Sequence, residues 1–241
     1  MTVALDNPAF WIAVAQIIVI DIFLSGDNAV VIALACRNLP AEQRRQGVLW
    51  GVAGALGLRV LFTFFATTLL DLPFLKIISG LLLLWIGVKL LVPESEEEHN
   101  LPASEHLWGA VRTIITADFV MSLDNVVAVA AAAEGSLPLI LFGLAVSVPF
   151  IIGASQGVMK LMDRFPVIIT AGGGLLGWVA GSMLVTDPVI HPHLNQWLGT
   201  EAPGAPFHHW LGGALGAVLV VALGRWLANR QDIREAEAED A

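Results

Sequence analysis

The chain has 241 residues, of which 56% are hydrophobic and only 14% are charged. About a quarter of the residues in soluble domains are charged, so this composition excludes an ordinary soluble globule and indicates a protein with several membrane-spanning segments. The formal net charge of -9 comes largely from two acidic clusters, at residues 94–98 and 235–240, and no basic patch indicates binding to nucleic acid.

Apolar stretches that are long enough to cross a bilayer predict seven membrane helices. In chain order they are expected at residues 9–36, 45–70, 73–92, 107–133, 137–161, 165–185 and 208–228. The predicted fold class is therefore an all-α membrane protein with one transmembrane domain over residues 1–241.

The first predicted helix contains the stretch DIFLSGDNAVVIA at residues 21–33, and the fourth contains DFVMSLDNVVAVA at residues 118–130. At an offset of 97 residues their polar side chains match in pairs, which are Asp21 with Asp118, Ser25 with Ser122, Asp27 with Asp124, and Asn28 with Asn125. A charged side chain at the centre of a spanning helix costs about 2.5 to 3.5 kcal/mol. These carboxylates therefore need a compensating charge, and a bound cation is the simplest candidate.

Each copy of this motif opens a unit of three predicted helices, and an odd number of crossings makes the second unit enter the membrane upside down. This is the 3+3 inverted repeat of secondary transporters, which places the substrate site near the midplane between the repeats. The expected boundaries are repeat 1 at 9–92, an acidic inner loop at 93–106, repeat 2 at 107–185, an outer loop at 186–207, an extra seventh helix at 208–228 and a polar tail at 229–241.

Basic residues near the helix ends predict the orientation, because they gather on the cytoplasmic side. With the N-terminus outside, ten of them lie at inner ends: Arg37, Arg44, Arg45, Lys89, Arg112, Lys160, Arg164, Arg225, Arg230 and Arg234. Only Lys76 lies at an outer end. We therefore expect the N-terminus outside and the C-terminus inside.

The two motifs offer oxygen ligands only, which suits hard divalent cations such as Mn, Mg or Ca rather than Zn or Cu(I). The candidate metal ligands are Asp21, Asp27, Asn28, Asp118, Asp124 and Asn125, with Ser25 and Ser122 as candidate helpers. At 100° per residue, Asp27 and Asp124 point about 120° away from the other motif residues on their helices. All of them can meet one ion only if a helix unwinds, and Ser25 and Gly26 favour unwinding in the first copy. Which aspartates bind metal and which carry protons stays open.

Polar residues outside the two motifs give weaker indications of function. Arg59 lies near the centre of the second helix, where we expect it to pair with a motif aspartate as a counterion, either fixed or moving when metal arrives. Ser147 is expected to be an interhelical hydrogen-bond partner. Four histidines on the outer connection are either incidental or ligands for a soft divalent ion: His191, His193, His208 and His209.

The two motifs together resemble the paired signatures of the TerC family of integral membrane proteins, and the chain is most similar to its shorter, YjbE-type members. The resemblance covers both motif helices and the seven-helix layout. It implies a multi-pass protein of the bacterial inner (cytoplasmic) membrane, from a family linked to manganese efflux and tellurium resistance. It also implies a LysE-superfamily-like fold and involvement in supplying manganese to secreted enzymes.

These observations together predict a proton-coupled exporter of Mn(II), with the metal as transported ion rather than as cofactor. The alternatives are a proton or sodium channel or exchanger, and a non-transporting membrane partner in metal loading of secreted proteins. Expected partners are the divalent cation, the lipid bilayer, and either a second copy of the chain or translocation machinery. An enzyme is not expected, because no nucleophile with its base and no phosphate-binding loop is visible.

Overall fold

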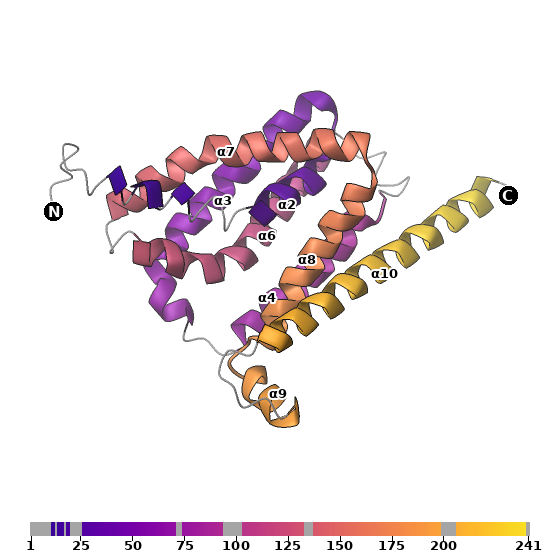
Figure 1. Cartoon of the computed structure of the whole chain (residues 1–241). Coiled ribbons are helices and arrows are strands. Elements are labelled where there is room, and N and C mark those ends of the chain that lie inside the picture. The colour runs from indigo at the N-terminus through magenta and orange to yellow at the C-terminus, as the bar shows by residue number, and fades with distance from the viewer. Residues whose placement is uncertain are drawn as a thin grey trace. The chain divides into compact units, whose positions relative to one another are not determined.

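The computed structural model describes residues 11–12, 14–16, 18–19, 26–70, 74–93, 103–132, 137–198 and 206–239. Within these segments the side chains are described except at 63–70, 103, 123–132, 137–140, 195, 197–198, 206–207, 232 and 234–239. The described part of the chain is helical and contains no strand (Figure 1), as the sequence predicts.

The chain divides into two compact units, each made from two separate stretches of sequence. Unit 1 consists of Met1–Asp71 and Leu107–Leu161, and unit 2 consists of Leu72–His106 and Met162–Ala241. The units do not coincide with the predicted repeats, because unit 1 takes the first two helices of each repeat and unit 2 takes the third. The division into one domain with two successive inverted repeats stays a prediction.

Unit 1 contains α2 (Gly26–Cys36), α3 (Ala41–Leu70), most of α6 (Ala103–Ala132) and most of α7 (Leu137–Arg164). Helix α2 packs on α3, and α3 meets α6 through small residues. A Cβ added at Gly51 would lie 2.6 Å from Cδ1 of Ile114, which is closer than atoms can pack. Helices in lipid have only a weak hydrophobic driving force to associate, so this close fit contributes to the packing of α3 on α6.

Unit 2 contains α4 (Leu75–Leu91), α8 (Val167–Val185), α9 (Ile190–Leu198) and α10 (Pro206–Glu239). Helices α4, α8 and α10 pack side by side, each against the other two (Figure 1). Where α8 meets α10, a Cβ added at Gly181 would collide with the carbonyl oxygen of Gly212, and one added at Gly177 would collide with that of Gly216. Glycine is required at this crossing because the two backbones touch directly.

The helices differ from the sequence prediction most clearly in one additional helix and in the longer extents of α10 and α6. The predicted outer loop contains the helix α9. Asp187 caps the start of this helix, because its Oδ1 accepts the Val189 N–H at 2.8 Å, and Pro188 follows Asp187 in the sequence. An Asp-Pro pair is a standard helix start, so the sequence held this signal. Helix α10 continues to Glu239 because the predicted polar tail is rich in Ala, Glu and Arg, which favour helix. Helix α6 likewise begins at Ala103, inside the predicted inner loop.

Three described helical segments are long and apolar enough to cross a membrane: Leu141–Arg164, Val167–Val185 and His208–Gln231. A shorter apolar helix, α2, forms the end of the first predicted span, and residues 11–12, 14–16 and 18–19 of that span are also helical. Large apolar side chains such as Trp85, Phe150 and Val218 are exposed on the helices, as a lipid-facing surface requires. The count of seven spans stays a prediction.

Candidate functional site

A buried ion pair connects the middle of α3 to the middle of α6. The Arg59 Nη2 donates to Asp118 Oδ1 at 3.1 Å, and only 5% of Arg59 and 6% of Asp118 are exposed. The sequence prediction that Arg59 pairs with a motif aspartate is therefore confirmed. A guanidinium and a carboxylate so far from water are stable only together, because removing either leaves the other as an isolated buried charge.

Ser122 completes this network from the next turn of α6. Its hydroxyl donates to Asp118 Oδ2 at 3.0 Å and accepts from Arg59 Nε at 3.4 Å. Residues four apart lie on one face of a helix, which brings Ser122 directly beside Asp118. Both oxygens of the Asp118 carboxylate thus have protein partners, one on α3 and one on α6.

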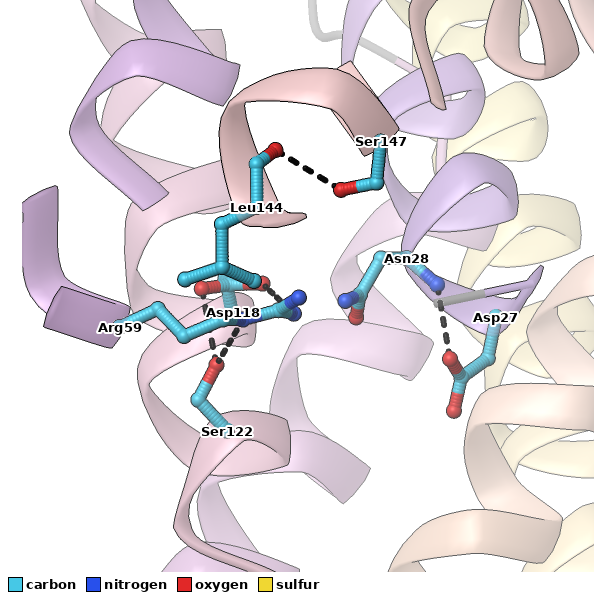
Figure 2. A network of polar contacts seen from close by, with 7 residues as sticks. All are labelled: Asp27, Asn28, Arg59, Asp118, Ser122, Leu144 and Ser147. Carbon is cyan, nitrogen blue, oxygen red and sulfur yellow. Dashed lines mark hydrogen bonds and ion pairs between the residues drawn. The ribbon is translucent and has the colours of Figure 1, made fainter. Parts of the chain in front are cut away.

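Asn28, in the first turn of α2, faces this network from the other copy of the motif. Only 5% of the residue is exposed. Neither Nδ2 nor Oδ1 of its side chain has a hydrogen-bond partner among the described residues. Figure 2 shows the carboxamide turned toward Arg59 and Asp118. A buried polar group without a partner costs about 1 to 3 kcal/mol, so a protein keeps one mainly where a ligand or a moving group will use it.

Asp27 directly precedes Asn28, but its side chain points in a different direction. Its Oδ1 accepts the backbone N–H of Asn28 at 2.9 Å, and Figure 2 shows Asp27 on the far side of Asn28 from the Arg59–Asp118 pair. Helical periodicity predicts this divergence, because neighbouring residues on a helix point about 100° apart. Asp27 is half-buried and does not line the cavity that Asn28 lines.

Residues of four helices of unit 1 line a partly open cavity, whose empty space is about 450 Å³ when the part open to solvent is included. Its polar lining consists of Asn28, Arg59, Asp118 and Ser147, and its apolar lining consists of Val31, Ile32, Val52, Ala55, Leu56, Ile114, Leu144, Val148 and Ile151. Asn28 belongs to the first motif and Asp118 to the second. The two copies, 97 residues apart in sequence, therefore contribute polar groups to one cavity.

Ser147 was expected only as an interhelical hydrogen-bond partner, yet it lines this cavity from α7. Its hydroxyl donates to the carbonyl oxygen of Leu144 at 2.8 Å, and the residue is 1% exposed. Two positions later Pro149 lies within α7, where it has no N–H to donate to the preceding turn. A serine just before a proline within an apolar helix was the available signal for a functional position.

Several predicted ligands lie outside the described residues. Asp21 and Ser25 belong to the segment 20–25, and Asp124 and Asn125 lie on α6 with side chains that are not described. The backbone of α6 is nevertheless helical from Ala103 to Ala132, so the second motif does not unwind. The described part of the first motif starts at Gly26, where α2 begins.

The outer histidines do not form a metal cluster with three ligands. The rings of His191 and His208 lie edge to face with centroids 6.4 Å apart. In the part of the chain that the structure describes, no three His, Cys, Asp or Glu side chains gather closely enough to hold a metal ion.

Comparison with known proteins identifies the family. Residues 6–232 match the family described as "Integral membrane protein TerC family". The chain belongs to the TerC family. It is 44% identical over 187 residues to "Uncharacterized membrane protein YjbE" of Bacillus subtilis, which covers 78% of this chain and 85% of that protein. The predicted resemblance to the shorter TerC members is therefore confirmed.

More distant TerC-like relatives come from two bacteria. The chain is 25% identical over 188 residues to "Uncharacterized membrane protein YceF" of Bacillus subtilis, covering 74% of the chain and 73% of that protein. It is 24% identical over 204 residues to "UPF0053 inner membrane protein YgdQ" of Escherichia coli, covering 78% of the chain and 86% of that protein. No solved structure matches the chain.

Proposed function

We propose that this TerC protein exports a divalent cation, Mn(II), from the cytoplasm across the bacterial cytoplasmic membrane. One observation carries the proposal: Asn28 of the first motif and Asp118 of the second line the same buried cavity, and the Asn28 carboxamide has no partner among the described residues. Carboxylate, amide and hydroxyl oxygens are the ligands that hard divalent cations prefer. The choice of manganese within that group follows from the family resemblance.

Transport requires that the cavity open to each side of the membrane in turn. The proposed inverted repeat provides two related halves for such alternating access. The grouping of helices supports it, because the motif helices α2 and α6 lie in unit 1 with α3 and α7, while the third helix of each repeat, α4 or α8, lies in unit 2. The N-terminus would lie outside and the C-terminus inside, as the basic residues indicate.

Protons returning through a carboxylate would drive export, because protonation of a ligand weakens metal binding. Asp118 already accepts hydrogen bonds from Arg59 and Ser122 in this network. Asp27 is a better candidate for the proton carrier, since the hydrogen bond that its carboxylate accepts is from the Asn28 backbone N–H and not from a member of that network. Asp21 and Asp124 are the remaining candidates for metal ligands or proton carriers.

Uptake of radioactive manganese into inverted membrane vesicles tests the proposal directly, because their outer face is the cytoplasmic one. We expect uptake that increases when the vesicle interior is acidified, and that Asp27→Ala and Asp124→Ala abolish both the uptake and the manganese tolerance of cells lacking their own exporter. Glu105→Gln, an exposed acid at the start of α6, is the matched control and should have no effect.

Two results would exclude manganese export. Proton currents that are indifferent to manganese would indicate a proton or sodium channel or exchanger. Full tolerance in the motif variants at normal membrane levels, with loss of function on changing the loops or the C-terminal segment, would indicate an assembly partner that transports nothing.

A further inference from the structure

Three exposed cations of unit 2 each lie over an exposed aromatic ring. With the distance from the cationic group to the ring centroid, the pairs are Lys89 over Trp85 at 5.6 Å, Arg164 over Phe165 at 5.5 Å and Arg230 over Trp226 at 3.9 Å. The negative face of an aromatic ring attracts a cation, so each contact holds a positive charge directly beside an apolar surface.

Two of the pairs lie at the same end of unit 2. The helices α8 and α10 touch at two places, Gly177 with Gly216 and Gly181 with Gly212. As the residue number rises by four on α8, it falls by four on α10, so the two helices run antiparallel. The same register places Val167, the first residue of α8, about level with Trp226 on α10. The Arg164–Phe165 pair, directly before α8, therefore lies at the end of unit 2 that carries the Trp226 pair.

Helix α4 brings the third pair to this end. A Cβ added at Gly87 would lie 3.2 Å from Cγ1 of Val220, and one added at Gly224 would lie 2.7 Å from Cβ of Leu91. The numbers rise together on the two helices, so α4 and α10 run parallel. Lys89, near the end of α4, therefore lies within about two turns, or about 12 Å, of the other two pairs along the helix direction.

These cations have no anionic partner in the part of the chain that the structure describes. Lys89, Arg164 and Arg230 make no hydrogen bond or ion pair with another described residue. Arg225 of α10 is also exposed and adds a fourth positive charge at this end. A guanidinium that stacks on a ring uses only its flat face, so its N–H groups remain available at the edge for an anion.

Acidic residues of the chain offset this charge only in part. Asp163 is the neighbour of Arg164 and can balance that one cation. The acids of α10 begin at Asp232, beyond the apolar segment that ends at Gln231, and α10 continues away from α4 and α8 in that direction (Figure 1). Along α10 the cations therefore come first where the apolar segment ends, and the acids follow further from it.

The surface that adjoins the cations is apolar. Leu81 on α4 and Val218 and Leu223 on α10 are exposed on the parts of these helices that precede the cations. A ligand that contacts this surface and the cations together must combine an anionic group with an apolar one. Free phosphate has no apolar part, whereas a phospholipid has both.

We propose that this end of unit 2 binds anionic phospholipids, whose phosphate groups accept hydrogen bonds from Lys89, Arg164 and Arg230. Basic residues next to a spanning helix attract anionic headgroups, and aromatic rings prefer the boundary between headgroups and acyl chains. Toward the opposite end of unit 2, the rings of Trp178 and Trp210 pack on each other at 5.1 Å instead of on a cation. The lipid site is independent of the ion that the protein transports.

Binding of a fluorescent phosphatidylglycerol to the full-length protein in a neutral detergent tests the proposal. We expect unlabelled phosphatidylglycerol to compete, and phosphatidylcholine and inorganic phosphate not to compete. Lys89→Gln and Arg230→Gln should each weaken binding about 5-fold, the contribution of one basic residue near an anionic surface. The control Arg45→Gln removes an exposed arginine of α3, in unit 1, and should leave the affinity unchanged.

A further variant tests the aromatic part of the site. Trp226→Leu retains an apolar side chain but removes the ring beneath Arg230, and we expect it to weaken binding about 3-fold. All of the replaced side chains are exposed, so the unfolding temperature without lipid should not change.

Four results would overturn the lipid site. They are equal affinity for phosphatidylglycerol and phosphatidylcholine, competition by inorganic phosphate, unchanged affinity in both Lys89→Gln and Arg230→Gln, and a loss in Arg45→Gln as large as in those two variants.

Discussion

The two units of this protein hold their helices together in different ways. In unit 2, α8 and α10 meet where glycines let one backbone touch the other, as at Gly181 and Gly212. In unit 1, α3 and α6 are joined at their centres by the ion pair of Arg59 and Asp118, beside a cavity. A direct backbone contact has one favourable arrangement, whereas a charged pair can open if another charge takes its place. If the protein transports a cation as we propose, we expect the groups that respond to the ion to lie in unit 1 and unit 2 to be the more rigid unit.

The largest effect is expected from removing the charge of Asp118. In Asp118→Asn the shape is retained, but the buried ion pair with Arg59 is lost, and breaking a buried pair costs about 3 to 5 kcal/mol of stability. We expect manganese export to be lost and the thermal unfolding temperature in detergent to fall clearly. Glu105→Gln on the same helix is the control, and an active Asp118→Asn protein of normal stability would contradict the central role of the pair.

A substitution in unit 2 should reduce stability without a direct effect on the cation site. A Cβ in Gly181→Ala would collide with the Gly212 carbonyl, and forcing an atom into a close-packed contact costs about 1 to 3 kcal/mol. In Gly174→Ala the added atom would lie 3.5 Å from Val221 Cγ2, an ordinary contact. We expect a lower unfolding temperature for Gly181→Ala only, with manganese affinity unchanged in the folded fraction. Equal stability of the two variants would mean that the glycine contact is not what holds α8 to α10.

Replacing Asn28 should raise the stability of the protein and impair its binding of manganese. Leucine has a similar size and no polar atoms, so Asn28→Leu removes a buried amide that has no partner among the described residues. We expect the protein to become more stable by about 1 to 3 kcal/mol, while manganese no longer raises its unfolding temperature. Thermal unfolding with and without Mn(II) measures both effects. A destabilised variant that still responds to Mn(II) would exclude Asn28 as a ligand.

The smallest effect is expected at Ser147. Its hydroxyl donates to the carbonyl oxygen of Leu144, three residues earlier on the same helix, so Ser147→Ala loses this local hydrogen bond. We expect a change in stability of no more than about 1 kcal/mol and a modest decrease in manganese affinity, because one of the oxygens that line the cavity is lost. A titration of Mn(II) binding measures this. A complete loss of binding would place Ser147 among the principal ligands and extend the site to α7.

Much of the site follows from the sequence because it depends on repetition and periodicity within single helices. The two motif copies, the buried position of Arg59 and its pairing with a motif aspartate are all predictable from polar residues in apolar stretches. Helical periodicity also separates Asp27 from Asn28 in direction. The TerC resemblance rests on the same residues, and the match over residues 6–232 confirms it.

Only the tertiary structure shows which of these groups meet. All four motif aspartates were candidate partners of Arg59, and the packing of α3 on α6 brings Asp118 to it. The same packing brings Asn28 and Ser147 to one cavity and combines helices of both predicted repeats in each compact unit. Helical periodicity determines the direction in which each side chain points from its own helix axis. Which helices become neighbours depends on how the side chains of different helices pack together, and this packing cannot be derived from a single sequence.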